Sequence, residues 1–371
     1  MIITYHFKIK PNKEQEKLLI NTLKYSRYLY NHLLDLRIRH YHNYKKSISK
    51  GELENYAKFL ATTDEFAFLK EIHSHLVQDV VARLDNSYDR FFKKLAGFPK
   101  FKNSKKYNSF TFKQPSKMNL FSSEGFVNIS KVGLIRLINH QGLDLKKLNK
   151  TTDIKTLNIK KENNSWYCNL TIEVAIEEDY KVDYSNAIGV DLGIKSYLAL
   201  SNGIFVENPK YLRASEAKLK QLQKQYSRKA KGSNNQEKLR NKINRLHLKI
   251  KNQRRDFLHK VSLMLVKTYD VLVFEKLRIK NMVKNRKLSK SISDASWGTL
   301  LKYVEYKSLK YNKIFEQVDP KNSSQICLCG EPVPKTLEDR LHVCPICHTI
   351  EDRDTHSAKV ILSRSKYIKT T

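Results

Sequence analysis

Long apolar stretches are absent from this sequence. No run approaches the ~18 residues of a membrane-spanning helix, and the opening segment, MIITYHFKIKPNKEQ, lacks the apolar core of a secretory signal peptide. Internal repeats and long low-complexity tracts are missing as well. These absences argue against an integral membrane or secreted protein and predict a cytoplasmic one.

Acidic residues are scarce relative to basic ones. Lysine and arginine number 70 against 37 aspartate and glutamate residues, which gives a formal net charge of +33 over 371 residues. Such an excess repels itself in a compact fold unless a polyanion neutralises it. Nucleic acid is the first such partner to consider and would associate the protein with the nucleoid; an anionic membrane surface is the rival. The length favours two or three packed units, since single hydrophobic cores stop growing near ~250 residues.

Cysteine is also rare, and four of the five cysteines crowd near the end of the chain. The four are Cys327, Cys329, Cys344 and Cys347. This clustering indicates a metal site rather than disulfides, whereas Cys168 is expected to be a buried strand residue.

The spacing of the four cysteines is typical of a zinc ribbon, with one deviation. The second pair has the two intervening residues of a zinc knuckle, but the first pair has only one. We expect one structural, tetrahedral Zn²⁺. Two alternatives stay open: an empty, degenerate ribbon, or a ribbon that uses His342 or His348 in place of a thiolate.

Helical and strand-like patterns alternate along the chain. Residues 11–97 carry apolar residues at helical spacing, with Asn12 as the predicted N-cap of the first helix. The preceding segment, ITYHFKI, and short segments between residues 109 and 174 have strand character, including a hairpin with its turn at Glu162–Ser165. We therefore expect the helices to be inserted into a β-barrel whose first strand precedes them.

Two apolar strands end in acidic residues. Asp191 follows the run AIGV, and Glu275 follows the run VLVF; a carboxylate in such a place is costly unless a cation receives it. Asp354, just before the helical run SAKVIL, is a third candidate, with Asp352 as the alternative. Three such acids can hold two divalent ions about 4 Å apart, and oxygen ligands favour Mg²⁺ or Mn²⁺. Taken singly, each acid would be a surface or salt-bridged residue.

Short motifs occur in a characteristic order along most of the chain. They are GFPKFK at 97–102, IGVDLGIK at 188–195, RDFLHK at 255–260, FEKL at 274–277, SSQ at 323–325 and the segment from Cys344 to Asp354. In these motifs the chain resembles the TnpB family, RNA-guided DNA endonucleases of insertion sequences that are related to the compact type V CRISPR nucleases.

The resemblance implies a multidomain α+β fold. It comprises a wedge-like N-terminal β-barrel with an inserted helical recognition domain, and an RNase H-like (RuvC) α/β nuclease domain with an inserted zinc ribbon. The expected bounds are 1–10 and 98–183 for the barrel, 11–97 for the helical insertion, 184–322 and 351–362 for the nuclease, 323–350 for the ribbon and 363–371 for a loose basic tail.

The resemblance also implies a metal-dependent endodeoxyribonuclease. Family members bind a guide RNA copied from the transposon end and cut complementary double-stranded DNA next to a short adjacent motif. By matching motif, Asp191, Glu275 and Asp354 take the three catalytic positions. The chain departs from the family in its shortened first cysteine pair and in His356–Ser357, where the family usually has Asn-Ala.

Two long basic helical segments, 212–230 and 236–268, lie between the first two acids. Charge runs are usually solvated faces, but in a chain of this charge with three candidate metal-binding acids we expect phosphate contacts. The helical insertion is expected to cradle a guide–target heteroduplex by shape. The candidate nucleic-acid-binding residues are Lys100, Lys102, Arg228, Lys229, Arg254 and Arg255.

Two other functions compete with guided cleavage. A DDE-type transposase or integrase also has an RNase H-like core with three acids, but it would not normally place a zinc ribbon between the second and third. A guided DNA-binding protein with weak or no cleavage predicts the loss of at least one acid, and none is missing.

Overall fold

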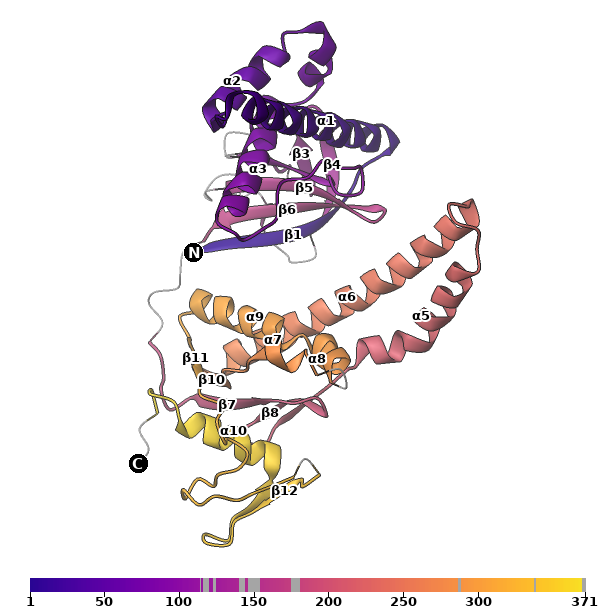
Figure 1. Cartoon of the computed structure of the whole chain (residues 1–371). Coiled ribbons are helices and arrows are strands. Elements are labelled where there is room, and N and C mark those ends of the chain that lie inside the picture. Colours follow the sequence, from indigo (N-terminus) through magenta and orange to yellow (C-terminus); the bar gives the residue numbers. More distant parts are fainter. Residues whose placement is uncertain are drawn as a thin grey trace. The chain divides into compact units, whose positions relative to one another are not determined.

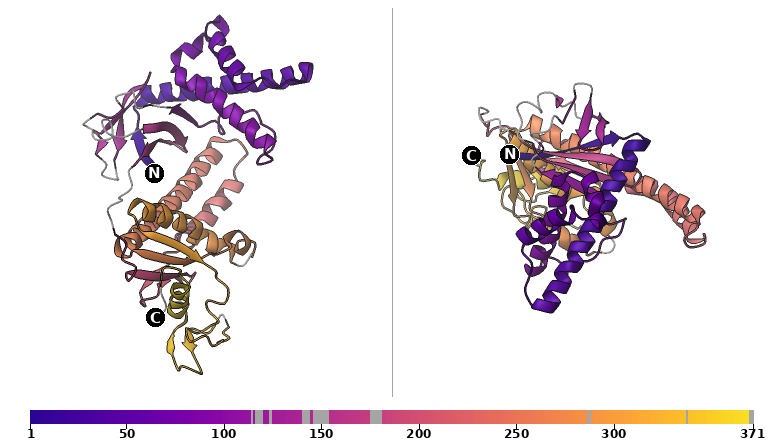
Figure 2. Two further views of the ribbon diagram at one scale, coloured as in Figure 1. Left: turned by 90° about the vertical axis from the view of Figure 1, so that its left-hand side faces the viewer. Right: turned by 90° about the horizontal axis from the view of Figure 1, so that it is seen from above.

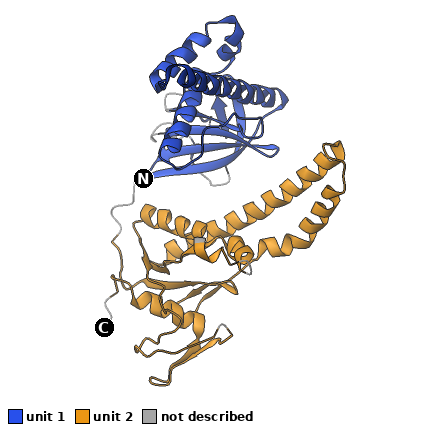
Figure 3. Ribbon diagram, viewed as in Figure 1, with its two compact units in different colours: residues 1–174 blue, residues 175–371 orange. Residues whose placement is uncertain are grey.

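The computed structural model forms two compact units, Met1–Val174 and Ala175–Thr371 (Figure 3). The structure describes residues 1–113, 115, 120–122, 125–139, 144–145, 154–174, 181–285, 288–336 and 338–368. No helix in these ranges is long and apolar enough to cross a membrane.

The first unit combines a six-stranded antiparallel sheet with helices (Figure 1). Along the sequence, these helices come between the first strand and the second. The sheet order is β2-β5-β6-β1-β4-β3, so β1 is central although it comes first in the chain. The strands are β1 Ile2–Lys10, β2 Ser109–Lys113, β3 Phe126–Ile129, β4 Gly133–Ile138, β5 Ile154–Glu162 and β6 Ser165–Glu173. The helices are α1 Lys13–Tyr44, α2 Lys50–Leu60, the 3₁₀ helix η1 Asp64–Glu71 and α3 Ser74–Phe92.

The barrel expected from the sequence is open. Strands β2 and β3 lie at the two edges of the sheet, and no ladder joins them within the described residues. The helical run between β1 and β2 begins as predicted: Asn12 caps α1 in a capping box with Gln15. The β5–β6 hairpin also turns where expected, with Asn163 in the left-handed region at φ 54°.

The second unit is built on a five-stranded mixed sheet of order β11-β10-β7-β8-β9. β7, β8 and β9 form an antiparallel meander, and β10 and β11 run parallel to β7. The strands are β7 Ala187–Leu192, β8 Ser196–Leu200, β9 Phe205–Glu207, β10 Val271–Glu275 and β11 Ile314–Val318, and the short pair β12 Leu341–Val343 and β13 Ile350–Asp352 forms a separate sheet. The helices are α5 Tyr211–Ser227, α6 Asn234–Thr268, α7 Ile279–Met282, α8 Ser289–Ala295, α9 Trp297–Lys310 and α10 Arg353–Ser363.

Helices cover both faces of this second sheet (Figures 1 and 2). Ile188, Val190 and Phe274 point to the face packed by α6 and α9. Val273 points to the opposite face, where it packs with Ile361 of α10. Because side chains alternate along a strand, Gly189 and Asp191 share the face of α10.

Candidate active site and metal centre

Glycine at position 189 lets α10 lie directly on β7. A Cβ atom there would fall 2.0 Å from the backbone oxygen of Ala358 in α10, so any side chain would clash with backbone. Asp191 follows two residues later on the same face, and Asp354 lies in the first turn of α10. The close helix–strand contact therefore brings the third candidate acid toward the first.

Parallel pairing places the second acid beside the first. Phe274 of β10 pairs with Val190 of β7, so the next residues, Glu275 and Asp191, lie at the ends of neighbouring strands. Glu275 is buried, and the Ser323 hydroxyl donates to its carboxylate. The three acids thus come from β7, β10 and α10, three elements far apart in the sequence.

The three carboxyl groups interact electrostatically. Burial of its carboxyl group raises the pKa of Asp191 to about 8, although the residue as a whole is half-buried, and the charges of Glu275 and Asp354 act in the same direction. Burial also raises the pKa of Glu275, against the hydrogen bond from Ser323. Such a cluster of like charges is costly unless a cation receives it.

Asp354 and Asp352 play different parts at the start of α10. Asp352 is the N-cap, since its Oδ1 accepts from the backbone N–H groups of Asp354 at 2.9 Å and Thr355 at 3.1 Å. The Asp354 carboxylate instead lies 3.1 Å from Nη2 of Arg353 and 3.9 Å from Nη1 of Arg340. This geometry favours Asp354 over Asp352 as the third acid, because the helix N-terminus already engages Asp352.

The donor set at the acids fits a hard divalent cation, although the oxygens stand further apart than the sulfurs of the cysteine cluster. In the described part of the chain, two groups of three or more potential metal ligands have all their ligand atoms within 4.8 Å of one another, and their members are all cysteines or histidines. The three acids do not form such a group. Each of two carboxylates is engaged by a neighbour, Glu275 by Ser323 and Asp354 by Arg353. Carboxylate oxygens suit Mg²⁺ or Mn²⁺.

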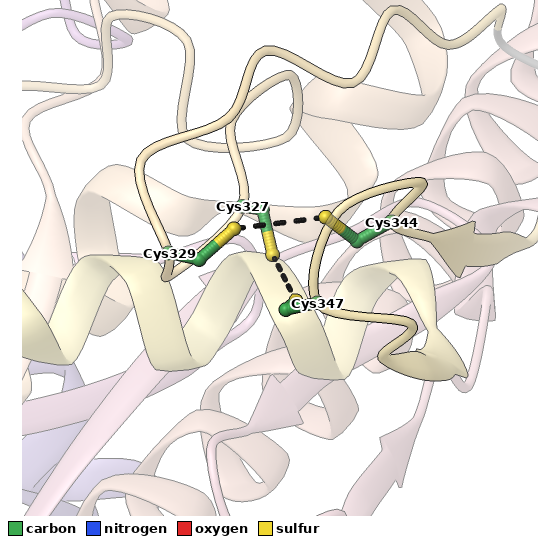
Figure 4. A group of neighbouring side chains, drawn as sticks. All are labelled: Cys327, Cys329, Cys344 and Cys347. Carbon is green, nitrogen blue, oxygen red and sulfur yellow. Dashed lines mark hydrogen bonds between the residues drawn. The ribbon is translucent and has the colours of Figure 1, made fainter.

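The four cysteines converge from two turns (Figure 4). All four sulfurs lie within 4.8 Å of one another, with 3.5 Å between Cys327 and Cys347 and 3.6 Å between Cys329 and Cys344. These separations are far too long for a disulfide, at about 2.05 Å. They match the edge of a tetrahedron of thiolates around zinc with Zn–S bonds of about 2.3 Å.

One of these thiols is predisposed to ionise. The Thr349 hydroxyl, 3.1 Å from the sulfur of Cys347, lowers the pKa of that thiol together with the backbone of Thr349 and the neighbouring thiols. Burial raises the pKa of the Cys327 thiol. Metals bind the thiolate form, so the donor set fits Zn²⁺. The first cysteine pair has only one intervening residue, yet its sulfurs join those of the second pair in the same cluster.

The six basic residues expected to contact nucleic acid differ in their surroundings. Lys100, Arg228 and Lys229 are exposed, and Lys102 and Arg255 are half-buried. Arg254 pairs with Asp294, which also accepts from the backbone N–H of Leu212. That guanidinium therefore ties α6 to α8, a partnership that sequence reasoning could not foresee.

Sequence reasoning also missed the parts played by Gly189 and Arg340. A glycine inside an apolar strand is a known signal for close backbone approach, and it stands two residues before Asp191. No comparable signal marks Arg340, because its neighbour Asp354 is brought to it by the fold.

The chain matches known protein families and a relative over most of its length. Residues 171–286 match the model of a family described as a probable transposase, residues 297–361 match a Cas12f1-like TNB domain, and residues 1–46 match a helix-turn-helix domain. A Streptomyces pristinaespiralis protein, provisionally named an RNA-guided DNA endonuclease, is 31% identical over 368 residues, which cover 97% of this chain and 88% of that protein. The chain belongs to the TnpB family.

Other similarities agree with membership of the TnpB family. An Escherichia coli K12 protein, provisionally named RNA-guided DNA endonuclease InsQ, is 27% identical over 376 residues, which cover 97% of this chain and 91% of that protein. A solved structure of a Cas12f1–sgRNA–target DNA complex has a TM-score of 0.61 at 15% identity and covers 97% of this chain and 98% of its own. This likeness shows that the TnpB chain shares a mixed α/β, multidomain fold with Cas12f1.

Proposed function

We propose that the chain is an RNA-guided DNA endonuclease associated with a transposon. It binds a guide RNA from the transposon end and cleaves complementary double-stranded DNA next to a short adjacent motif. The observation that carries the proposal is that the charges of Glu275 and Asp354 both act on Asp191, beside the contact of α10 with β7 at Gly189. The full-length relatives provisionally named RNA-guided DNA endonucleases support it.

The three acids would hold two Mg²⁺ or Mn²⁺ ions, which when bound activate water and stabilise the leaving oxygen of the phosphodiester. The chain's own groups fix the ligands. Asp191 is positioned by β7, Ser323 orients Glu275 through its hydroxyl, and Arg353 holds the carboxylate of Asp354. These contacts restrict the rotamers of the acids, which favours preorganised ligands.

The strand order of the second unit supports an RNase H-like (RuvC) nuclease at residues 184–322 and 351–362. In that reading the antiparallel meander β7–β9 is followed by two strands parallel to β7. Residues 323–350 form an inserted ribbon with one structural Zn²⁺ on the four cysteines, and 363–371 a basic tail. Residues 1–10 and 98–183 form the wedge and 11–97 the recognition insertion.

Exposed basic groups would contact the phosphates of guide and target. Helix α5 has no buried residue, and together with α6 it extends beyond the sheet of its own unit (Figure 1). Arg228 and Lys229 lie exposed between these helices, and Lys100 lies exposed after α3. Such contacts are salt-dependent and blind to sequence, which leaves recognition to base pairing. Action on DNA places the protein in the cytoplasm, in association with the nucleoid.

A DDE-type transposase is the second candidate, since one matching family is described as a probable transposase. Guided cleavage is favoured because relatives matched over nearly the whole chain are provisionally named endonucleases. Purification from cells that also carry the DNA flanking the gene tests the proposal. We expect a discrete co-purified RNA whose 3′ guide, when replaced, redirects cleavage to matching DNA. A preparation without discrete RNA, or cleavage that ignores the guide, would refute it.

A further inference from the structure

Two buried histidines stack against each other beside the cysteine cluster. His342 lies on β12 and His356 on α10; their ring centroids are 3.5 Å apart, their planes differ by 8°, and neither residue is exposed. A ring nitrogen of each lies within 4.8 Å of the sulfur of Cys327.

The hydrogen bonds of His356 compete with metal binding. Its Nδ1 lies 2.6 Å from a carboxylate oxygen of Glu351, and its Nε2 lies 3.3 Å from the backbone oxygen of Ile326. Both ring nitrogens of His356 thus have an acceptor beside them. The four cysteines have no such competing partners on every sulfur, so we assign the metal to the cysteines rather than to the two histidines and Cys327.

His342 has a hydrogen-bond donor, rather than an acceptor, beside one of its ring nitrogens. Its Nδ1 lies 2.5 Å from Nζ of Lys335, which also donates to the backbone oxygen of Ser324 at 3.2 Å. An ammonium group only donates, so Nδ1 accepts and Nε2 carries the proton. That Nε2 is buried and has no hydrogen-bond partner in the described structure, which is a costly state for an N–H group.

The cysteine cluster offers the acceptor that this N–H lacks. Four thiolates around one Zn²⁺ leave a net negative charge, which hydrogen-bond donors stabilise. In the shortened first pair, the N–H of Gly330 donates to the backbone oxygen of Cys327 at 2.9 Å rather than to its sulfur. The backbone N–H of Cys329 donates to the sulfur of Cys327. Cys327 is itself buried, so solvent cannot easily supply a further donor.

We propose that His342 is an outer hydrogen-bond donor of the ribbon's zinc site: its Nε2–H donates to the zinc-bound thiolate of Cys327, with the Lys335 ammonium behind it. The inference rests on the proposed binding of zinc by the four cysteines. The side chain adds a second donor to the backbone N–H of Cys329, which already donates to the sulfur of Cys327. His342 thus positions and stabilises a ligand without being one.

Two substitutions of His342 in the full-length protein test this role. His342→Phe keeps an aromatic ring in the stack but removes the N–H, whereas His342→Gln restores an N–H donor. We expect the phenylalanine variant to lose about 10- to 100-fold in zinc affinity, measured by chelator competition, since outer donors of metal ligands have effects of this size. We expect the glutamine variant to recover part of the loss, and His348→Asn, which changes the exposed histidine of the ribbon, to match wild type.

Cobalt substitution distinguishes the donor role from a purely structural one, because the charge-transfer band reports the hydrogen bond to the sulfur. In Co²⁺-loaded protein, loss of the N–H should shift the sulfur-to-cobalt charge-transfer band of His342→Phe to lower energy, and His342→Gln should shift it back. The d–d bands of a four-sulfur site should stay unchanged in all variants.

The outcomes separate the two proposals. Wild-type protein without one tightly bound zinc would overturn zinc binding by the ribbon and this inference with it. One bound zinc, with affinity and charge-transfer band unaltered in His342→Phe, would overturn only the role of His342. A change in the d–d bands on loss of His342 would make it a direct ligand and would also overturn the donor role.

Discussion

The acid cluster and the cysteine cluster of the second unit collect their side chains in different ways. The acids stand on two strands and a helix, and their carboxylates do not all lie within 4.8 Å. The cysteines stand on two turns (Figure 4), and their four sulfurs all lie within 4.8 Å of one another. Neutral thiols can pack together, whereas buried carboxylates repel one another. The geometry of the acid cluster therefore depends on the strands and the helix that carry it, whereas the geometry of the cysteine cluster depends mainly on the cysteines themselves.

This difference shows where each site is vulnerable. The scaffold of the acid cluster consists of a bare backbone contact at Gly189 and two neighbours that engage carboxylates, Ser323 and Arg353. Changes outside the ligand set should therefore damage the acid site strongly. The cysteine cluster should respond to its ligands and their hydrogen-bond donors.

Chelation should separate the two clusters most sharply. Brief treatment with EDTA should abolish DNA cleavage, and added Mg²⁺ or Mn²⁺ should restore it, because Mg²⁺ is bound through few protein ligands. Zinc should leave much more slowly during the same brief treatment, because a structural site with four filled ligand positions offers the chelator no open position. Cleavage assays beside zinc analysis of the treated protein measure both effects. Continued cutting in EDTA would contradict the account of the acids.

Gly189→Ala should break the scaffold of the acid cluster without touching an acid. The new Cβ would clash with the backbone of Ala358 and push α10, which carries Asp354, away from β7. We expect a loss of ~1–3 kcal/mol in stability and about 10²-fold slower cleavage, because small misplacements of catalytic groups cost that much.

A matched glycine controls for this change. In α9, a Cβ at Gly298 would meet Cδ1 of Ile279 at 3.6 Å, an ordinary contact. Gly298→Ala should keep wild-type cleavage and gain up to about 1 kcal/mol from helix propensity. Thermal unfolding and cleavage rates of the two variants make the comparison, and equal rates would show that the contact at Gly189 does not position the site.

Ser323→Ala should weaken the acid cluster more mildly. It removes the hydroxyl that donates to Glu275, and outer-donor losses typically cost about 10- to 100-fold in metal affinity or activity. We expect the Mg²⁺ concentration needed for half-maximal cleavage to rise by about tenfold. The neighbouring Ser324→Ala leaves the backbone bond of that residue intact and should behave like wild type; an equal rise in both variants would contradict the role of Ser323.

Lys307 offers a buried charge outside both clusters, and its effect should be on stability alone. Its ammonium donates to the backbone oxygen of His259 and the hydroxyl of Ser262, each at 2.7 Å. Burial lowers the pKa of Lys307 to about 8. Between that pH and about 10.4 the unfolded chain binds more protons than the folded one, so stability should rise with pH.

Lys307→Met should abolish this rise and add at most about 3 kcal/mol at pH 7, since each pKa unit is worth about 1.4 kcal/mol. Denaturant unfolding at pH 7 and pH 10 measures the effect, and cleavage should be unchanged. A variant with the same pH dependence as wild type would show that another group titrates.

The sequence predicted the acids at the strand ends better than it predicted their third partner. Asp191 and Glu275 follow apolar runs, and the parallel pairing of β7 with β10 brings them together as that pattern implies. The choice between Asp352 and Asp354 depended on family resemblance, because both fall where a strand meets a helix. Only the fold shows that Asp352 caps α10.

Other features lay beyond sequence because they depend on partners far along the chain. Arg254 stays a predicted nucleic-acid contact, but its ion pair with Asp294 could not be read from the sequence. Within the residues that the structure describes, the predicted barrel is an open sheet, since whether two edge strands meet depends on curvature rather than on strand pattern. By contrast, the cysteine cluster followed from spacing alone, because all its members lie in one short segment.

Cleavage by Asp191→Ala, measured beside guide-RNA affinity in the same preparation, tests the central claim most directly. We expect cutting of guide-matched DNA to fall below detection, because the charges of both other acids act on Asp191, while RNA affinity stays at the wild-type value. The control Asp256→Ala removes an exposed acid of α6 and should cut normally. Undiminished cutting by Asp191→Ala would contradict the assignment of the three acids as the active site.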